Sequence, residues 1–283
     1  MQSNNPVFRR SEEFSRSGGG GYQGFGQQQY GGQPGQPYPG YGQPGQPVPT
    51  PTTGTGRMTI DTVVQSTSIT IGITILAAAV TWLVTPAISP DTGIPSSLLA
   101  ASVIGSGAAF ILSLVNSFKR IISPGLVMAF AVAEGVALGA LSELFNAVYG
   151  GGIVVQAVIG TFAAFGGTLA AYKFFDIKVG NKFRTFVIAA MFGMVALSLF
   201  EVVLGLFGSN LGLFEDGALG LVFAIAGLVL GVFMLILDFD FVEQGVRNGL
   251  PERESWRASF GLLVSLVWIY TNLLRILAIL QQD

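Results

Sequence analysis

Carboxylates lie inside long apolar stretches of this 283-residue chain. They are Glu134, Glu143, Glu201 and Asp238, with Asp240 at the edge of the same stretch as Asp238. An acid inside a membrane span is costly unless it is protonated, paired or hydrated. Oxygen ligands without nitrogen or sulfur suit hard cations such as Ca²⁺, or protons. Asp238, Glu134 and Glu201 are therefore candidates for a staircase of acids, that is, a series of acids at increasing depth from one membrane surface across the bilayer.

The depth of each acid along its expected helix separates the candidates. Glu134 lies about 15 Å from the start of its span, near the middle of the bilayer, where a charge costs at least ~2.5 kcal/mol. We therefore expect Glu134 to face the interior of the bundle, protonated or partnered. Glu143, nine residues further on, falls on the opposite helical face and is expected to reach the lipid headgroups. Glu201, roughly 24 Å along its helix, is either a vestibule acid or an interfacial one.

Asp238 and Asp240 follow the uninterrupted apolar run 218–237. Two residues correspond to about 200° of rotation on a helix, so only one of these acids can line a pore. Asp240 is expected to be solvated charge outside the membrane, together with the acids of the following segment, which are Glu243, Glu252 and Glu254. Arg275, near the far end of the last apolar segment, is expected to pair with an acid or to reach lipid phosphates.

The overall composition indicates an integral membrane protein. The chain is 51% hydrophobic and 11% charged, which is too apolar for an ordinary soluble domain. A net charge of −2 gives no basic surface for nucleic acid. The chain has no Cys and no His, and no Ser or Lys stands in a recognisable nucleophile motif, so we expect neither an enzyme nor a bound metal or cofactor. Any response to pH must then come from carboxylates.

Apolar segments of about 20 residues, the length that spans a bilayer, predict an all-α bundle of seven transmembrane helices. They run at about 60–85, 97–117, 124–148, 152–172, 184–207, 217–240 and 257–280. If the helices alternate in direction, every Lys and Arg of the connections falls on one side, and the loops 86–96, 149–151 and 208–216 carry none. This asymmetry predicts a multi-pass protein with its N-terminus in the cytoplasm and its C-terminus outside.

The first 56 residues differ from the rest. They are rich in Gly, Gln, Pro and Tyr, and such a composition buries too little area to fold. We expect a disordered cytoplasmic tail over 1–56 and a membrane domain over 57–283. Pro34 with Pro37, and Pro44 with Pro47, have the PxxP spacing that polyproline-binding domains recognise, although a solvated low-complexity tail is the simpler interpretation.

Several ordered motifs resemble the bacterial branch of the Bax inhibitor-1 family, also called the transmembrane Bax inhibitor motif family. They are EGVALGALS at 134–142, GIVVQAVIGT at 152–161, DFDFVE at 238–243, LVWIY at 266–270 and LLRIL at 273–277. The resemblance covers about 57–283 and leaves out the tail. It implies seven helices around a central last helix, a pH-sensitive calcium leak, and in some bacterial members the modulation of a membrane-bound protease.

The resemblance also implies a gate made of two acids, one at the end of the sixth helix and one in the seventh, which protonation switches. Asp238 matches the first position, and Ser265 stands at the second. Asp240 lies about 200° around the helix from Asp238, so it cannot replace the acid that is missing at position 265. Either the gate is a single Asp hydrogen-bonded to Ser265, or this branch is not gated by pH in the same way.

These patterns together predict a passive calcium or proton-linked cation leak in the plasma (inner) membrane of a bacterium. Asp238 is the expected gate and Glu134 the expected mid-membrane acid, with Ser265 and Glu201 beside the pathway. The alternative is a non-conducting regulator that binds a membrane protease or another quality-control complex. Asp240 and Arg275 are secondary candidates for the site.

Overall fold

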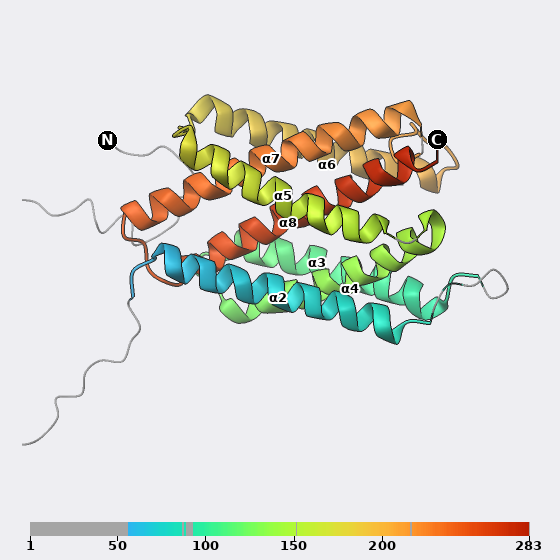
Figure 1. Ribbon diagram of the computed structural model, residues 1–283, viewed down its shortest axis with the longest axis horizontal. Helices are drawn as coiled ribbons and strands as arrows, with labels where there is room; N and C mark the ends of the chain where they lie inside the picture. Colours follow the sequence, from blue (N-terminus) through green and yellow to red (C-terminus); the bar gives the residue numbers. More distant parts are fainter. Residues whose placement is uncertain (1–55, 87, 89–92, 151, 216, 283) are drawn as a thin grey trace, which may run out of the picture. The chain divides into compact units, whose positions relative to one another are not determined.

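Long helices follow one another along the chain with short connections (Figure 1). The computed structural model describes residues 56–86, 88, 93–150, 152–215 and 217–282. Within them the helices are α2 (Ile60–Val84), α3 (Ser96–Phe118), α4 (Pro124–Tyr149), α5 (Ile153–Phe174), α6 (Asn181–Leu206), α7 (Ala218–Arg247) and α8 (Glu254–Leu280). All seven are long and apolar enough to cross a membrane, which confirms the predicted fold class. The predicted tail and its PxxP motifs lie, up to residue 55, outside the described residues.

Local chemistry sets where the helices begin and end. At the start of α2, the Thr59 hydroxyl accepts from the Thr62 N–H at 3.2 Å and the Thr62 hydroxyl accepts from the Thr59 N–H at 3.0 Å, a reciprocal cap. Pro124 occupies the first turn of α4, where its missing N–H costs nothing. Helix α7 continues to Arg247 and does not end near residue 240, because no Pro follows before Pro251 and the first following glycine with a positive φ is Gly249, at +63°.

Helix α8 is the central element of the bundle. It packs against α7, α2, α5 and α4, while α3 packs mainly on α4 and α6 on α7. Figure 1 shows α8, in red, running between the layer of α2, α3 and α4 and the layer of α5, α6 and α7. The largest buried cluster joins Leu262 and Ile269 of α8 to Leu235 and Phe239 of α7. The predicted central last helix is therefore present, although α3 and α6 pack chiefly on its neighbours.

Glycines spaced four residues apart allow two close helix contacts. A Cβ at Gly139 of α4 would lie 2.9 Å from the Ala78 Cα of α2, and a Cβ at Gly231 of α7 would lie 2.6 Å from the Ile269 Cγ1 of α8. A side chain at either position would force these helices apart. Each of these glycines stands four residues after another glycine, Gly135 and Gly227, that also lies at a close helix contact.

The ends of the bundle differ in charge. The end at which α2, α4, α6 and α8 begin, here called the basic end, carries the lysines and arginines of the connections. Two contacts tie the basic end together: Arg57 forms a β-bridge with Pro251, and the Arg257 guanidinium donates to the Arg120 carbonyl at 2.9 Å. The other end is called the opposite end below.

Candidate functional site

A carboxylate and a hydroxyl join α7 and α8 inside the bundle. The expected position of Asp238 at the end of its helix is wrong, because α7 continues for nine residues, about 14 Å, beyond it to Arg247. The Ser265 hydroxyl of α8 donates to Asp238 Oδ2 of α7 at 2.5 Å. Ser265 is buried and Asp238 is half-buried. Gly261, one turn before Ser265, leaves room for the acid, because a Cβ there would lie 2.9 Å from Asp238 Oδ1. A short hydrogen bond to an acid is among the stronger polar contacts between helices.

The seam that holds this pair is apolar on both sides. Leu235 and Phe239 flank Asp238 on α7 and pack with Leu262 and Ile269 of α8. One turn beyond Ser265, the Trp268 indole N–H donates to the Gly227 carbonyl at 2.9 Å and fixes the register of the two helices. The Asp238–Ser265 pair is therefore a polar contact inside a packed helix seam.

Asp240 is not solvated charge, which corrects the sequence-based expectation. Its carboxylate pairs with the Arg184 guanidinium of α6 at 2.7 Å and accepts from the Gln244 amide at 2.7 Å, and only 7% of the residue is exposed. The reason is the length of α7: position 240 is still helical and faces α6. As the helical rotation predicted, Asp240 does not share the face of Asp238.

Glu243 completes the pattern of the DFDFVE motif. It accepts from the Tyr172 hydroxyl of α5 at 2.7 Å and pairs with Arg247 one turn further along α7. The three acids of the motif thus bind three different helices, α8 through Asp238, α6 through Asp240 and α5 through Glu243. The sequence analysis does not identify Arg184 and Tyr172 as site residues. The signal for Arg184 is a cation at the fourth residue of the helix that begins at Asn181.

Glu134 faces α8 from α4, whereas Asp238 contacts α8 from α7. Glu134 is half-buried and lines a cavity of about 280 Å³ between α3, α4 and α8. Hydroxyls of the same cavity come from Ser106, Ser113 and Thr271, and its apolar wall includes Trp268. No hydrogen bond or ion pair reaches the Glu134 carboxylate from the described part of the chain. Glu134 thus faces a pocket between helices whose rim includes exposed residues of α3, Ser106 and Phe110, and its place in an ion pathway stays a prediction.

Asp238 and Glu134 are not brought together. Asp238 is not among the residues that line the Glu134 cavity, and α4 and α7 meet chiefly through α8. The two acids approach adjacent positions of α8, since Val264 lines the Glu134 cavity and Ser265 binds Asp238. The expected staircase is therefore interrupted by α8, and the described residues include no group of three or more acids that could hold one metal ion.

Glu201 and Arg275 hold the same loop at the opposite end. Both Glu201 carboxylate oxygens accept backbone N–H groups, of Leu211 at 2.8 Å and Leu213 at 3.1 Å. The Arg275 guanidinium donates to the Leu213 carbonyl at 2.5 Å and lies 5.1 Å from the centroid of the Phe214 ring. Glu201 is buried, so its carboxylate organises the loop between α6 and α7, and its place in an ion pathway stays a prediction.

Glu143 does not reach the headgroups, which is a second correction. It is buried and accepts a short hydrogen bond from the Thr85 hydroxyl, at the residue that follows α2. Thr85 itself ends the helix, and its hydroxyl oxygen also lies 2.8 Å from the Thr81 carbonyl oxygen. Glu143 therefore ties the ends of α4 and α2 together.

The fold and these contacts define a multi-pass, all-helical membrane protein with acids between its helices. The family model described as Bax inhibitor 1 like matches residues 5–282. The chain belongs to the Bax inhibitor 1-like family. It is also 27% identical over 159 residues to a protein of Chlamydia muridarum (strain MoPn / Nigg) described as uncharacterized, covering 54% of this chain and 64% of that protein. The match thus spans less than two thirds of that relative.

Proposed function

We propose that the protein is a passive cation leak, for Ca²⁺ or for a proton-linked cation, in the plasma membrane of a bacterium. The clustering of Lys and Arg at the basic end supports an orientation with that end and the N-terminus in the cytoplasm and with the C-terminus outside. In this proposal Asp238 is the gate and Glu134 is a second acid at a similar depth, since they lie nine and ten residues from the basic ends of α7 and α4.

The hydrogen bond from Ser265 to Asp238 carries the proposal. While it is formed, the acid is occupied by a protein donor. When it breaks, the Asp238 carboxylate becomes available to a cation inside the bundle. Only one hydrogen bond has to break to release Asp238, and it joins only α7 and α8. Its loss therefore requires little rearrangement of the other helices.

Glu134 supplies the second oxygen site. Its cavity holds three hydroxyls and is lined by Val264 of α8, the neighbour in sequence of Ser265. Release of Ser265 from Asp238 therefore removes one contact of the α8 segment that separates the acid from the Glu134 cavity. In the proposed open state, a shift of this segment joins the two sites.

A second candidate function is a non-conducting regulator of a membrane protease or quality-control complex. It is favoured by the junction between the tail and the α7–α8 connection. The Met58 N–H donates to the Leu250 carbonyl and the Glu252 N–H to the Gly56 carbonyl, both at 2.7 Å. A partner bound to the tail could therefore change the position of the α7–α8 connection, which joins the helices that carry Asp238 and Ser265.

Calcium flux into proteoliposomes separates the two functions. We expect wild-type protein to conduct, and Asp238→Asn and Glu134→Gln each to lower the initial rate. Asp176→Asn is the matched control, because the Asp176 side chain is 83% exposed and Asn tolerates its φ of +47°. Absence of flux in the wild type, or equal flux in all four proteins, contradicts the leak. Co-purification of a protease that is lost on deleting residues 1–55 would then favour the regulator.

A further inference from the structure

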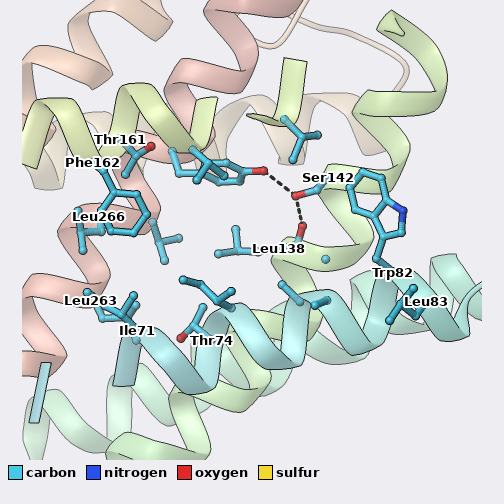
Figure 2. A pocket seen from close by; sticks show the side chains of 18 residues that line it. Ile71, Thr74, Trp82, Leu83, Leu138, Ser142, Thr161, Phe162, Leu263 and Leu266 are labelled. Carbon is cyan, nitrogen blue, oxygen red and sulfur yellow. Dashed lines mark hydrogen bonds between the residues drawn. The ribbon is translucent and has the colours of Figure 1, made fainter. Parts of the chain in front are cut away.

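A groove of about 490 Å³ runs along the bundle between α2 and α5, with α4 and α8 as its floor (Figure 2). Helices α2 and α5 each pack on α8 but form no extended contact with each other in the described residues. The groove therefore has an open side between these two helices. It is separate from the Asp238–Ser265 pair and from the Glu134 cavity, since neither acid lines it.

The lining of the groove is apolar. No Asp, Glu, Lys or Arg contributes to it. Its few hydroxyls are already engaged: Ser142 and Tyr270 bond to each other at 2.6 Å, and Thr161 donates to the Ala157 carbonyl at 2.7 Å. Dashed lines at Ser142 in Figure 2 mark its hydrogen bonds, which join its hydroxyl to the Tyr270 hydroxyl and to the Leu138 carbonyl. The part of a ligand that lies within the groove therefore contacts no charged side chain of the protein.

The length and position of the groove match one leaflet of a bilayer. On α2 it extends from Ile71 to Leu83, which is about 18 Å of helix. Half of the hydrocarbon core of a bilayer is about 15 Å thick. Because α2 begins at Ile60 and ends at Val84, the groove starts near mid-membrane and stops at the opposite end, where Trp82 lies. Tryptophan is typical of the boundary between hydrocarbon and headgroups.

The groove is continuous with the surface that faces lipid. Its rim includes side chains that are exposed on the bundle, among them Ile75, Leu83 and Phe162. Its floor includes Leu263 and Leu266 of α8, which are only 3% and 6% exposed. Bulk hydrocarbon can reach the rim from outside, whereas an atom that contacts the floor must lie inside the groove.

The length, the lining and the volume of the groove fit one apolar chain. A volume of about 490 Å³ lies in the range of pockets for single small ligands. We propose that the groove binds one acyl chain of a phospholipid from the leaflet at the opposite end of the bundle.

Photochemical labelling of the full-length protein in proteoliposomes tests this proposal. The probe is a phosphatidylcholine that carries a diazirine within one acyl chain, and the adducts are located by peptide mass spectrometry. We expect adducts at the floor, on the α8 segment that contains Leu263 and Leu266. Adducts confined to exposed side chains of the rim and the outer helix faces would overturn the proposal. So would a cross-link at the groove to a second copy of the chain, because it would make a protein segment the occupant.

Matched substitutions show whether the floor adducts depend on the groove. Val158 lines the groove on α5, whereas Val155, one turn away and also exposed, does not. Val158→Trp should abolish the floor adducts and Val155→Trp should retain them. Ile75→Trp and Leu76→Trp form a second pair on α2, for which the same difference is expected if the α5 variants do not fold. Equal floor labelling within both pairs contradicts the assignment.

Discussion

Asp238 and Asp240 lie two residues apart on α7 and bind different neighbouring helices, the first Ser265 of α8 and the second Arg184 of α6. The separation follows from about 200° of helical rotation between them. One short motif therefore fixes α7 to the centre of the bundle and to its periphery. The contact with α8 is a single hydrogen bond, whereas the contact with α6 is an ion pair with a second donor from Gln244. Asp240 is thus the anchor, and Asp238 is the acid that is released in the proposed leak.

The ion pair between Arg184 and Asp240 should contribute strongly to stability. Arg184→Ala leaves an uncompensated carboxylate that is almost buried, and we expect it to cost about 3 kcal/mol in the free energy of unfolding. Thermal unfolding in detergent measures the effect. Lys178→Ala is the control, because Lys178 and Asp176 are 86% and 83% exposed and their pair should contribute less than about 1 kcal/mol. Equal effects of the two variants would show that the buried pair is not an anchor.

Glu201 should control the order of the loop between α6 and α7. In Glu201→Gln an NH₂ group replaces one acceptor, so the N–H of Leu211 or Leu213 is left without its partner, at a cost of about 1–3 kcal/mol. We expect faster hydrogen exchange across 208–215, measured by mass spectrometry. Asp61→Asn, at the exposed start of α2, should leave exchange in this loop unchanged. Unchanged exchange in Glu201→Gln would contradict the assigned role.

A second acid at position 265 should create a pH-sensitive pair. In Ser265→Asp two carboxylates face each other across the seam and share a proton in acid, but both become charged as the pH rises. The stability of this variant should therefore fall with rising pH relative to Ser265→Asn, its uncharged counterpart. Thermal unfolding across a pH series measures the difference. Parallel curves for the two variants would mean that the side chains do not meet.

The seven spans and the central helix could be predicted because lipid requires long apolar helices, and α7 and α8 carry family motifs. The contacts of Asp240 and Glu143 could not. Asp240 was placed outside the membrane because the apolar run ends near residue 238, although the helix continues for lack of a breaker. The partner of Glu143 is Thr85, which lies beyond the end of another helix, and sequence alone does not give the mutual rotation of helices.

Met58 should be an anchor for the segment that precedes α2. Its side chain is 1% exposed and packs beside Gly245, where an added Cβ would lie 2.7 Å from the Met58 sulfur. Met58→Ala leaves a cavity and should cost about 2–5 kcal/mol in the free energy of unfolding. Ile60→Ala, two residues away and half exposed, should change it by less than about 0.5 kcal/mol. Similar losses in both variants would show that Met58 is not specifically held.

The role of the Asp238–Ser265 contact as a gate is tested most directly by a double-mutant cycle on calcium flux. Initial rates are measured in proteoliposomes for the wild type, Ser265→Ala, Asp238→Asn and the double variant. A gate predicts that Ser265→Ala raises the flux when Asp238 is present and has no further effect beside Asp238→Asn, because the bond it removes no longer holds a charged site. The same change in flux on both backgrounds, or none on either, would contradict the account.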